Sequence, residues 1–403
     1  MDSMIWEPID ISGMFLESLA ILAALFGHMS LWVVAFNNLH ARRMPFWSVQ
    51  ATSIVCYLSL VTIPFVYLYW YLTGYGPLHK VNVFATGRLV DGYVWVCWAF
   101  TLFVVLYRFR WIGDRANSPI RSNYTSRRDM LEQMGARYDG PAWVKSLAHV
   151  PGNQIFDLQV HDLELEIANL PQSLDGLSIA HLSDFHYTGD IAKAFFEEVI
   201  DVTLAMEADL IAITGDLVDK ARCFDWIDDT FGRLHAPAGV HYVLGNHDER
   251  VDVHELHRRL AACGLNHIGA RWQEITVRDQ KIVIAGNELP WFVPAADLEN
   301  APPKNANGEP LRIALAHSPD QFYWGQSHQI DLMLAGHTHG GQFRFPLIGA
   351  IVSPCLEGTR FAIGTYYRSP TVMHVSRGLS GTTPVRVGCP PELTRIVLRT
   401  PLS

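Results

Sequence analysis

The chain has 403 residues, of which 49% are hydrophobic and only 18% are charged, and its formal net charge is −9. Soluble domains usually carry about 25% charged residues. The negative net charge and the lack of any block of five like charges exclude intrinsic disorder, a collagen-like protein and a basic nucleic-acid tail. The six cysteines are scattered without a CxxC pair, and they indicate neither a zinc ribbon nor a disulfide framework.

Charge is distributed unevenly along the chain. Residues 1–150 contain 12 Lys+Arg and 9 Asp+Glu, whereas residues 151–403 contain the other 19 and 31. Together with the hydropathy pattern, this split predicts three regions. They are an all-α membrane region over 1–110, a basic juxtamembrane connector over 111–153 and a globular domain over 154–403.

Three apolar runs dominate the first region, and they extend from Leu19 to Phe36, from Val49 to Leu72 and from Tyr93 to Tyr107. A membrane helix needs about 20 apolar residues to cross the hydrocarbon layer. The first two runs meet that length, and the third must use residues from its flanks. We expect three membrane-spanning helices; the alternative is a buried helical core in a soluble domain.

The arginines predict how this region is oriented. Arg42 and Arg43 lie between the first two runs, and six arginines lie between residues 108 and 128, including Arg121. Because basic loops stay in the cytoplasm, three spans place the large domain on the cytoplasmic side. If the third run does not cross, that domain lies on the opposite side. The basic stretch either binds anionic headgroups of membrane lipids, with Arg121 among the substrate contacts, or only sets the topology.

A different pattern begins near residue 155, where short Ile-, Val- and Leu-rich runs alternate with helical stretches. Such runs, bounded by Gly or Pro, predict buried strands of an α/β fold. The predicted strands are Leu177 to Leu182, Leu210 to Thr214, Val240 to Leu244, Arg312 to Ala316 and Leu332 to Ala335. A helix is expected over Ile191 to Glu207, with Ala194, Phe195, Val199 and Val202 on one face.

Each predicted strand is followed by polar residues of a similar chemical kind. In chain order these are Asp184 and His186, Asp216, Asn246 and His247, His317, and finally His337 and His339. Open α/β sheets bind ligands outside the carboxyl ends of their strands. Carboxylate, imidazole and amide donors without thiolate suit Mn²⁺, Fe²⁺ or Zn²⁺. There are too many donors for one four-coordinate ion, but enough for two ions that share a carboxylate. We expect the glycines before Asp216, Asn246 and His337 to allow tight turns.

These motifs, in this order, resemble those of the calcineurin-like metallophosphoesterases. The D-x-H, G-D, G-N-H-D, lone His and G-H-x-H motifs all stand here, over roughly residues 175–345. The resemblance implies a β-sandwich flanked by helices. It also implies one ion held by Asp184, His186, Asp216 and His339, and a second ion held by Asp216, Asn246, His317 and His337.

The resemblance also implies a reaction, the hydrolysis of a phosphoester or pyrophosphate. A hydroxide held between the two ions would attack phosphorus in line. His247 would contact the phosphoryl or leaving-group oxygen, and Asp248 would lie behind His247 and orient its ring. Asp219 either accepts a hydrogen bond from a ligand histidine or stabilises a helix N-terminus.

The substrate is predicted from the membrane region and from an insertion at residues 287–310. This insertion contains Trp291 and Phe292; it either caps the site and binds apolar substrate or is an ordinary surface loop. Within the family, the chain resembles the membrane-anchored bacterial branch, which includes cell-envelope phosphodiesterases and relatives of UDP-2,3-diacylglucosamine hydrolases. We therefore expect a multi-pass protein of the bacterial inner membrane that cleaves a lipid-linked or nucleotide-lipid substrate, and no nucleic-acid partner.

Three other interpretations stay open from the sequence. The first is a phosphodiesterase that acts on soluble or cell-wall phosphoesters. The second is a non-catalytic membrane scaffold in which the metal domain binds partners, which the complete ligand sets disfavour. The third is a channel or transporter with a soluble appendage, which three spans with few charges disfavour.

Overall fold

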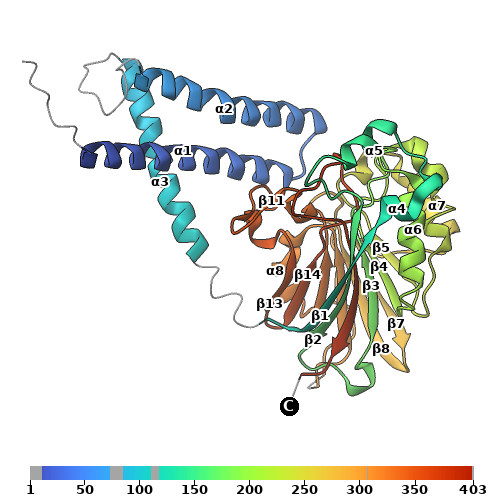
Figure 1. The fold of residues 1–403 in the computed structure, drawn as a ribbon. Coiled ribbons are helices and arrows are strands. Elements are labelled where there is room, and N and C mark those ends of the chain that lie inside the picture. The colour runs from blue at the N-terminus through green and yellow to red at the C-terminus, as the bar shows by residue number, and fades with distance from the viewer. Residues whose placement is uncertain (1–10, 73–84, 110–117, 306, 402–403) are drawn as a thin grey trace, which may run out of the picture. The chain divides into compact units, whose positions relative to one another are not determined.

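The computed structural model describes residues 11–72, 85–109, 118–305 and 307–401 (Figure 1). The chain divides into two compact units, one of residues 1–39 and 44–113 and the other of residues 40–43 and 114–403. Arg110 and Arg115, which contribute to the predicted orientation, lie outside the described residues.

The first unit consists of α1 (Ile11–His40), α2 (Phe46–Leu72) and α3 (Ala85–Phe109). Each helix contains a segment long and apolar enough to cross a membrane: Ser18–His40, Trp47–Val66 and Gly92–Phe109. Large apolar side chains stay exposed along all three helices, as expected of surfaces that face lipid rather than water. The prediction of three helices suited to a membrane is therefore confirmed.

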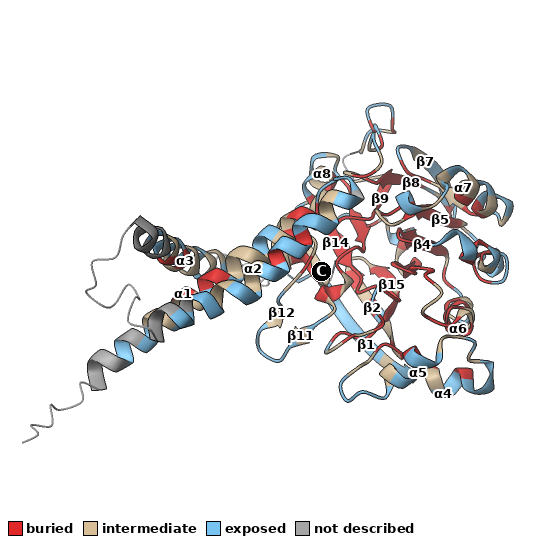
Figure 2. Cartoon of the chain, turned by 90° about the horizontal axis from the view of Figure 1, so that it is seen from above, coloured by how far each residue is buried: buried red, intermediate tan, exposed pale blue. Residues whose placement is uncertain are grey.

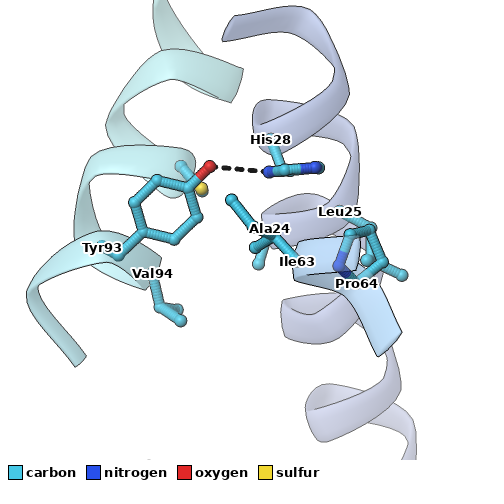
Figure 3. A pocket seen from close by; sticks show the side chains of 8 residues that line it. Ala24, Leu25, His28, Ile63, Pro64, Tyr93 and Val94 are labelled. Atoms are coloured by element: carbon cyan, nitrogen blue, oxygen red, sulfur yellow. Dashed lines mark hydrogen bonds between the residues drawn. The ribbon is translucent and has the colours of Figure 1, made fainter. Parts of the chain in front are cut away.

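Polar side chains join the helices of this unit at a small pocket (Figure 3). His28 on α1 and Tyr93 on α3 point toward one another, and His28 Nδ1 lies 2.6 Å from the Tyr93 hydroxyl. Trp32 Nε1 donates to the same hydroxyl over 3.2 Å. Ile63 and Pro64 of α2 complete the apolar lining. In an apolar environment such hydrogen bonds fix how helices pack.

The second unit contains two large sheets and a hairpin. The seven-stranded sheet has the order β1 (Ile120–Asp129), β2 (Asp157–Glu166), β15 (Glu392–Arg399), β3 (Ser178–Leu182), β4 (Leu210–Thr214), β5 (Val240–Val243) and β6 (Asn266–His267). The six-stranded sheet has the order β13 (Gly364–Arg368), β14 (Thr371–Val375), β10 (Leu332–Ala335), β9 (Leu311–Ala316), β8 (Gln280–Asn287) and β7 (Trp272–Val277). The hairpin pairs β11 (Arg344–Phe345) with β12 (Gly349–Ala350).

The two sheets form a sandwich because side chains alternate along each strand. On β4, Leu210 and Ala212 join the apolar core with Ile313 of β9, whereas Ile211 and Ile213 join the core under the helices. That second core includes side chains of four helices, α4 (Met130–Met134), α5 (Ala142–Ala148), α6 (Lys193–Leu204) and α7 (Val253–Ala262). The helix α8 (Phe322–Ser327) packs on the six-stranded sheet instead (Figure 1). The structure confirms the expected α/β sandwich flanked by helices.

The helix expected over Ile191 to Glu207 is α6, which begins two residues later and ends at Leu204. The four side chains expected on one face, Ala194, Phe195, Val199 and Val202, are all buried. A 3.6-residue period was sufficient to locate this helix, because its apolar stripe faces the seven-stranded sheet.

The start of the large unit differs from the expected connector over 111–153. Residues 120–129 form edge strand β1, which pairs antiparallel with β2 from Asp129↔Asp157 to Ile120↔Leu165. Nine of its ten residues are exposed, and the remaining one is half-buried. This strand therefore has no apolar alternation from which it could be recognised in the sequence.

A buried histidine beneath the site provides a test of this packing. His181 on β3 is fully buried, its Nε2 lies 2.9 Å from Thr214 Oγ1, and its ring meets that of His374 edge-on at 5.5 Å. Burial, reinforced by the positive charge that His374 can carry, lowers the pKa of His181 to about 3. The ring is therefore neutral in the folded protein at physiological pH.

We predict that His181 makes folding sensitive to acid. Between pH 6.5 and 3 the unfolded chain binds a proton at His181 that the folded chain excludes, so stability falls as pH falls. The slope is up to about 1.4 kcal/mol per pH unit. The His181→Gln variant should lose stability less steeply in urea unfolding of the detergent-solubilised protein. Parallel pH profiles for the two proteins would contradict the assignment.

Candidate metal centre

The candidate ligands lie where parallel strands of both sheets end at one edge. Strands β3, β4 and β5 run parallel in one sheet, as do β9 and β10 in the other. Asp184 and His186 follow β3, Asp216 follows β4, Asn246 and His247 follow β5, His317 follows β9, and His337 and His339 follow β10. Apolar strands thus carry the polar residues of both sheets to one place.

The backbone turns sharply as it leaves these strands. Asp184, His186, Asp216, His337 and His339 all have left-handed φ values, between 45° and 71°. For residues other than glycine this conformation costs on the order of 1 kcal/mol each and is often found at functional sites. The expectation of turn glycines holds for Gly215, where φ is 88°. Gly245 is required for a different reason, since a Cβ there would lie 2.2 Å from Asp216 Oδ1.

The first candidate cluster contains Asp184, His186, Asp216 and His339, whose donor atoms lie within 4.8 Å of one another. His186 Nε2 is 3.1 Å from His339 Nε2 and 3.3 Å from Asp216 Oδ2. His339 Nε2 is 3.5 Å from Asp184 Oδ1. Two imidazoles and two carboxylates converge here, as the resemblance implied.

The second cluster contains Asp216, His317 and His337, within the same limit of 4.8 Å. His317 Nε2 lies 3.3 Å from Asp216 Oδ2 and 3.2 Å from Asn246 Oδ1. Asp216 therefore belongs to both clusters, and its Oδ2 is equally far from one histidine of each. This is the position that a bridging carboxylate requires.

Within the two clusters, two buried atoms have no hydrogen-bond partner among the described residues: Asp216 Oδ2 and His337 Nε2. A buried polar atom without a partner costs roughly 1–3 kcal/mol, and such atoms at the centre of a donor set are best explained by a cation. Oxygen and nitrogen donors fit Mn²⁺, Fe²⁺ or Zn²⁺. The residues therefore fit the divalent ions that the resemblance implied.

Hydrogen bonds on the far side of three histidines fix which nitrogen faces the centre. His186 Nδ1 donates to Asp219 Oδ1 over 2.8 Å, and His317 Nδ1 donates to the Thr214 carbonyl over 2.7 Å. His339 Nδ1 donates to the Ser380 carbonyl over 3.0 Å. Because Nδ1 carries the proton, Nε2 offers its lone pair to a cation.

The carboxylates make the centre strongly attractive to positive charge. Burial opposes protonation of His186, but Asp219 and Asp216 outweigh burial and raise its pKa to about 9. The pKa of His317 is likewise raised to about 9 against burial, chiefly by Asp216. Without an ion, protons thus supply the positive charge, and a divalent cation competes for the same positions.

His247 lies beside the first cluster and is held by Asp219. His247 Nδ1 donates to Asp219 Oδ2 at 2.6 Å, while the other oxygen of Asp219 accepts from His186. Arg250 Nη1 also donates to Asp219, over 2.9 Å, and Arg250 Nη2 lies 3.2 Å from His247 Nε2. One carboxylate thus connects a candidate metal ligand with the candidate catalytic histidine.

The expected role of Asp248 is corrected by these contacts. Its Oδ1 accepts from the amides of Leu217 and Val218 at 2.9 and 3.0 Å, and its Oδ2 accepts from that of Gly245 at 2.8 Å. Asp248 therefore joins the loops after β4 and β5, and Asp219 makes the expected contact with the ring of His247. Residue spacing could not show which of these two carboxylates contacts His247. The first alternative given for Asp219, a hydrogen bond from a ligand histidine, agrees with its contact with His186.

The three expected substrate contacts lie in different places. Trp291 is 3% exposed, and its ring lies 4.6 Å from that of His337, so it packs on a candidate ligand and offers little surface to a substrate. Phe292 is half-buried against the core beneath the helices. Arg121 is not brought to the site: β1 runs so that Asp129 lies at the site edge and Arg121 at the opposite end.

Arg250 and Arg386 were missed by sequence reasoning. Arg250 stands three residues after His247, a spacing that could have suggested it. Arg386 is fully buried and donates to the same Ser380 carbonyl that accepts from His339. No motif marks Arg386, because it reaches the site from the loop after β14.

Comparison with known proteins agrees with this geometry. Residues 177–341 match the family model of the calcineurin-like phosphoesterases. The chain is 30% identical over 237 residues to the uncharacterized metallophosphoesterase YkuE of Bacillus subtilis, covering 57% of this chain and 82% of that protein. It is 29% identical over 225 residues to phosphodiesterase YaeI of Escherichia coli, covering 55% and 81%.

Another relative is named as a transmembrane protein. The transmembrane protein with metallophosphoesterase domain of Danio rerio is 27% identical over 257 residues, covering 60% of this chain and 57% of that protein. The chain belongs to the calcineurin-like metallophosphoesterase family and is a metal-dependent phosphoester hydrolase with a His/Asp cluster suited to metal ions.

We predict that Asp219 and Asp248 have separable roles. Asp219→Asn should lower kcat/KM by about 10–100-fold with little change in melting temperature, because it orients two histidines. Asp248→Asn should mainly lower stability, by about 1–3 kcal/mol, because a buried backbone amide loses its acceptor. Phosphodiester hydrolysis and thermal unfolding would be measured for both variants. The reverse pattern would contradict these roles.

Proposed function

We propose that this protein is a membrane-anchored phosphohydrolase that uses two divalent ions to cleave a phosphodiester or pyrophosphate bond in a lipid-linked substrate. The observation that carries the proposal is the position of Asp216 Oδ2, which lies 3.3 Å from a histidine of each cluster and has no hydrogen-bond partner among the residues that the structure describes. A paired-ion site is well suited to in-line displacement at phosphorus.

In this proposal the two ions share one set of side chains. One ion is held by Asp184, His186, Asp216 and His339, and the other by Asp216, Asn246, His317 and His337. When bound, such ions activate water and stabilise charge on phosphoryl oxygens. The protein residues hold this arrangement rigid through the Nδ1 hydrogen bonds and the strand ends described above.

His247 acts on the substrate through Nε2. Asp219 accepts from its Nδ1, and Nε2, which otherwise accepts from Arg250, would have to take up a proton before it could donate to a phosphoryl oxygen or to the leaving group. Arg250, whose side chain is about one-third exposed, places a guanidinium beside that nitrogen. A cation at this position favours an anionic phosphoester over a neutral ligand.

The proposed substrate class is supported by the membrane helices and by the relatives. A helical anchor keeps the catalytic unit near lipid-linked molecules, and one relative is named a transmembrane protein while another is named a phosphodiesterase. The arginine distribution favours the cytoplasmic face of a bacterial inner membrane. The oxygen and nitrogen donors suit iron or zinc as well as manganese.

We predict that His247→Gln lowers kcat by about 10²–10⁴-fold, the usual contribution of a general acid or a charge-stabilising donor. Metal content, measured by inductively coupled plasma mass spectrometry, should not change, because His247 is not among the proposed ligands. A variant that loses ions in parallel with activity would instead place His247 in the metal shell.

The lipid-linked substrate is tested with a panel presented in mixed micelles. The metal-loaded protein should cleave lipid-linked pyrophosphates and phosphodiesters faster than dinucleotides or bis-p-nitrophenyl phosphate. Chelation should abolish every activity, and Mn²⁺, Fe²⁺ or Zn²⁺ should restore it. A clear preference for soluble dinucleotides would overturn the lipid-linked assignment while leaving the hydrolase itself intact.

A further inference from the structure

An exposed apolar loop directly follows the metal-ligand segment. We define the apolar hairpin as residues 343–351, which contain β11 and β12 and begin four residues after His339. Leu347 at its tip is fully exposed, and Ile348 is 55% exposed. Figure 2 shows the hairpin projecting from the sheets with intermediate and exposed residues along it. Phe343, Phe345 and Ile351 are exposed as well.

The base of the apolar hairpin is fixed to the unit that holds the site. Arg344 N donates to the Val387 carbonyl at 2.8 Å, and Val387 N donates to the Gln342 carbonyl at 3.0 Å. At Gly341, an added Cβ would lie 2.4 Å from that of Ala350, so the two arms meet closely just after the ligand segment. A rigid base holds the apolar tip away from the core.

The composition of the hairpin differs from that of an ordinary surface loop. Half of the exposed large hydrophobic side chains in the described part of the second unit lie between residues 343 and 356. The only charged residue in that stretch is Arg344. Soluble proteins rarely expose such continuous apolar surface unless it binds a partner or a membrane. An apolar tip with a single cation suits the boundary between acyl chains and anionic headgroups.

We propose that the apolar hairpin inserts into the interfacial region of a lipid bilayer. A bilayer is the expected partner of this surface, because three helices of the same chain are long and apolar enough to span one. The inserted tip would hold His337 and His339, which precede the base of the hairpin in the chain, close to phosphoesters at the membrane surface. The inference rests on the membrane anchor of the proposed function but not on the identity of the substrate.

The test uses the full chain in nanodiscs of phosphatidylethanolamine and phosphatidylglycerol. An environment-sensitive fluorophore is attached at Leu347→Cys, or as a control at Lys281→Cys, which lies at the opposite end of β8 from the site and is well exposed. Unsubstituted protein, whose six cysteines are free, gives the labelling background. Spin-labelled lipids should quench the probe at 347 at least about twofold more than the probe at 281.

A second test introduces a negative charge at the tip of the hairpin and measures hydrolysis. Leu347→Asp should lower hydrolysis of a bilayer-embedded substrate by about tenfold, while hydrolysis of bis-p-nitrophenyl phosphate reports that the site is folded. Tyr124→Asp, at an exposed aromatic on edge strand β1, is the control. Equal quenching at positions 347 and 281 would overturn the proposal, as would a hairpin buried against a second copy or another part of the chain. If the unsubstituted protein did not hydrolyse bis-p-nitrophenyl phosphate at all, that result would instead contradict the proposed hydrolase activity.

Discussion

The structure depends on one buried carboxylate that two groups of histidines share. Asp216 lies at the end of β4, between ligands supplied by both sheets, and one of its oxygens has no hydrogen-bond partner in the described protein. Burying several carboxylates together is unfavourable unless positive charge offsets them. The high pKa values of His186 and His317 reflect that requirement. A pair of divalent ions meets it more completely than protons do.

The sandwich supplies the rigidity that this arrangement needs. The strands that end at the site are buried on both faces, with apolar cores between the sheets and under the helices. Five candidate ligands adopt a left-handed backbone conformation, which is held in place by the strands before them and by hydrogen bonds between loops. Asp248 contributes there by tying the loop after β4 to the loop after β5. Stability elsewhere in the domain thus offsets strain at the site.

The sequence was informative where chemistry and periodicity coincide. Buried strands read as apolar runs, and the polar residues directly after them identified the cluster, since parallel strands end at one edge. Edge strand β1 was missed because its side chains are almost all exposed and polar. The hydrogen-bond partner of His247 was wrongly predicted to be Asp248, the next residue in the sequence, because Asp248 accepts from backbone amides and Asp219 contacts the ring instead. Arg386 could not be found at all, because it reaches the site through tertiary packing rather than through a motif.

The shared carboxylate is tested most directly by counting bound metal. The purified full-length protein, loaded anaerobically with Mn²⁺ and freed of excess ion, should hold about two equivalents per chain. Asp216→Ala should hold well below one equivalent, because both ions lose a ligand, while its melting temperature without metal stays near that of the unsubstituted protein. Two equivalents retained by Asp216→Ala, with hydrolysis intact, would contradict a centre built around this residue.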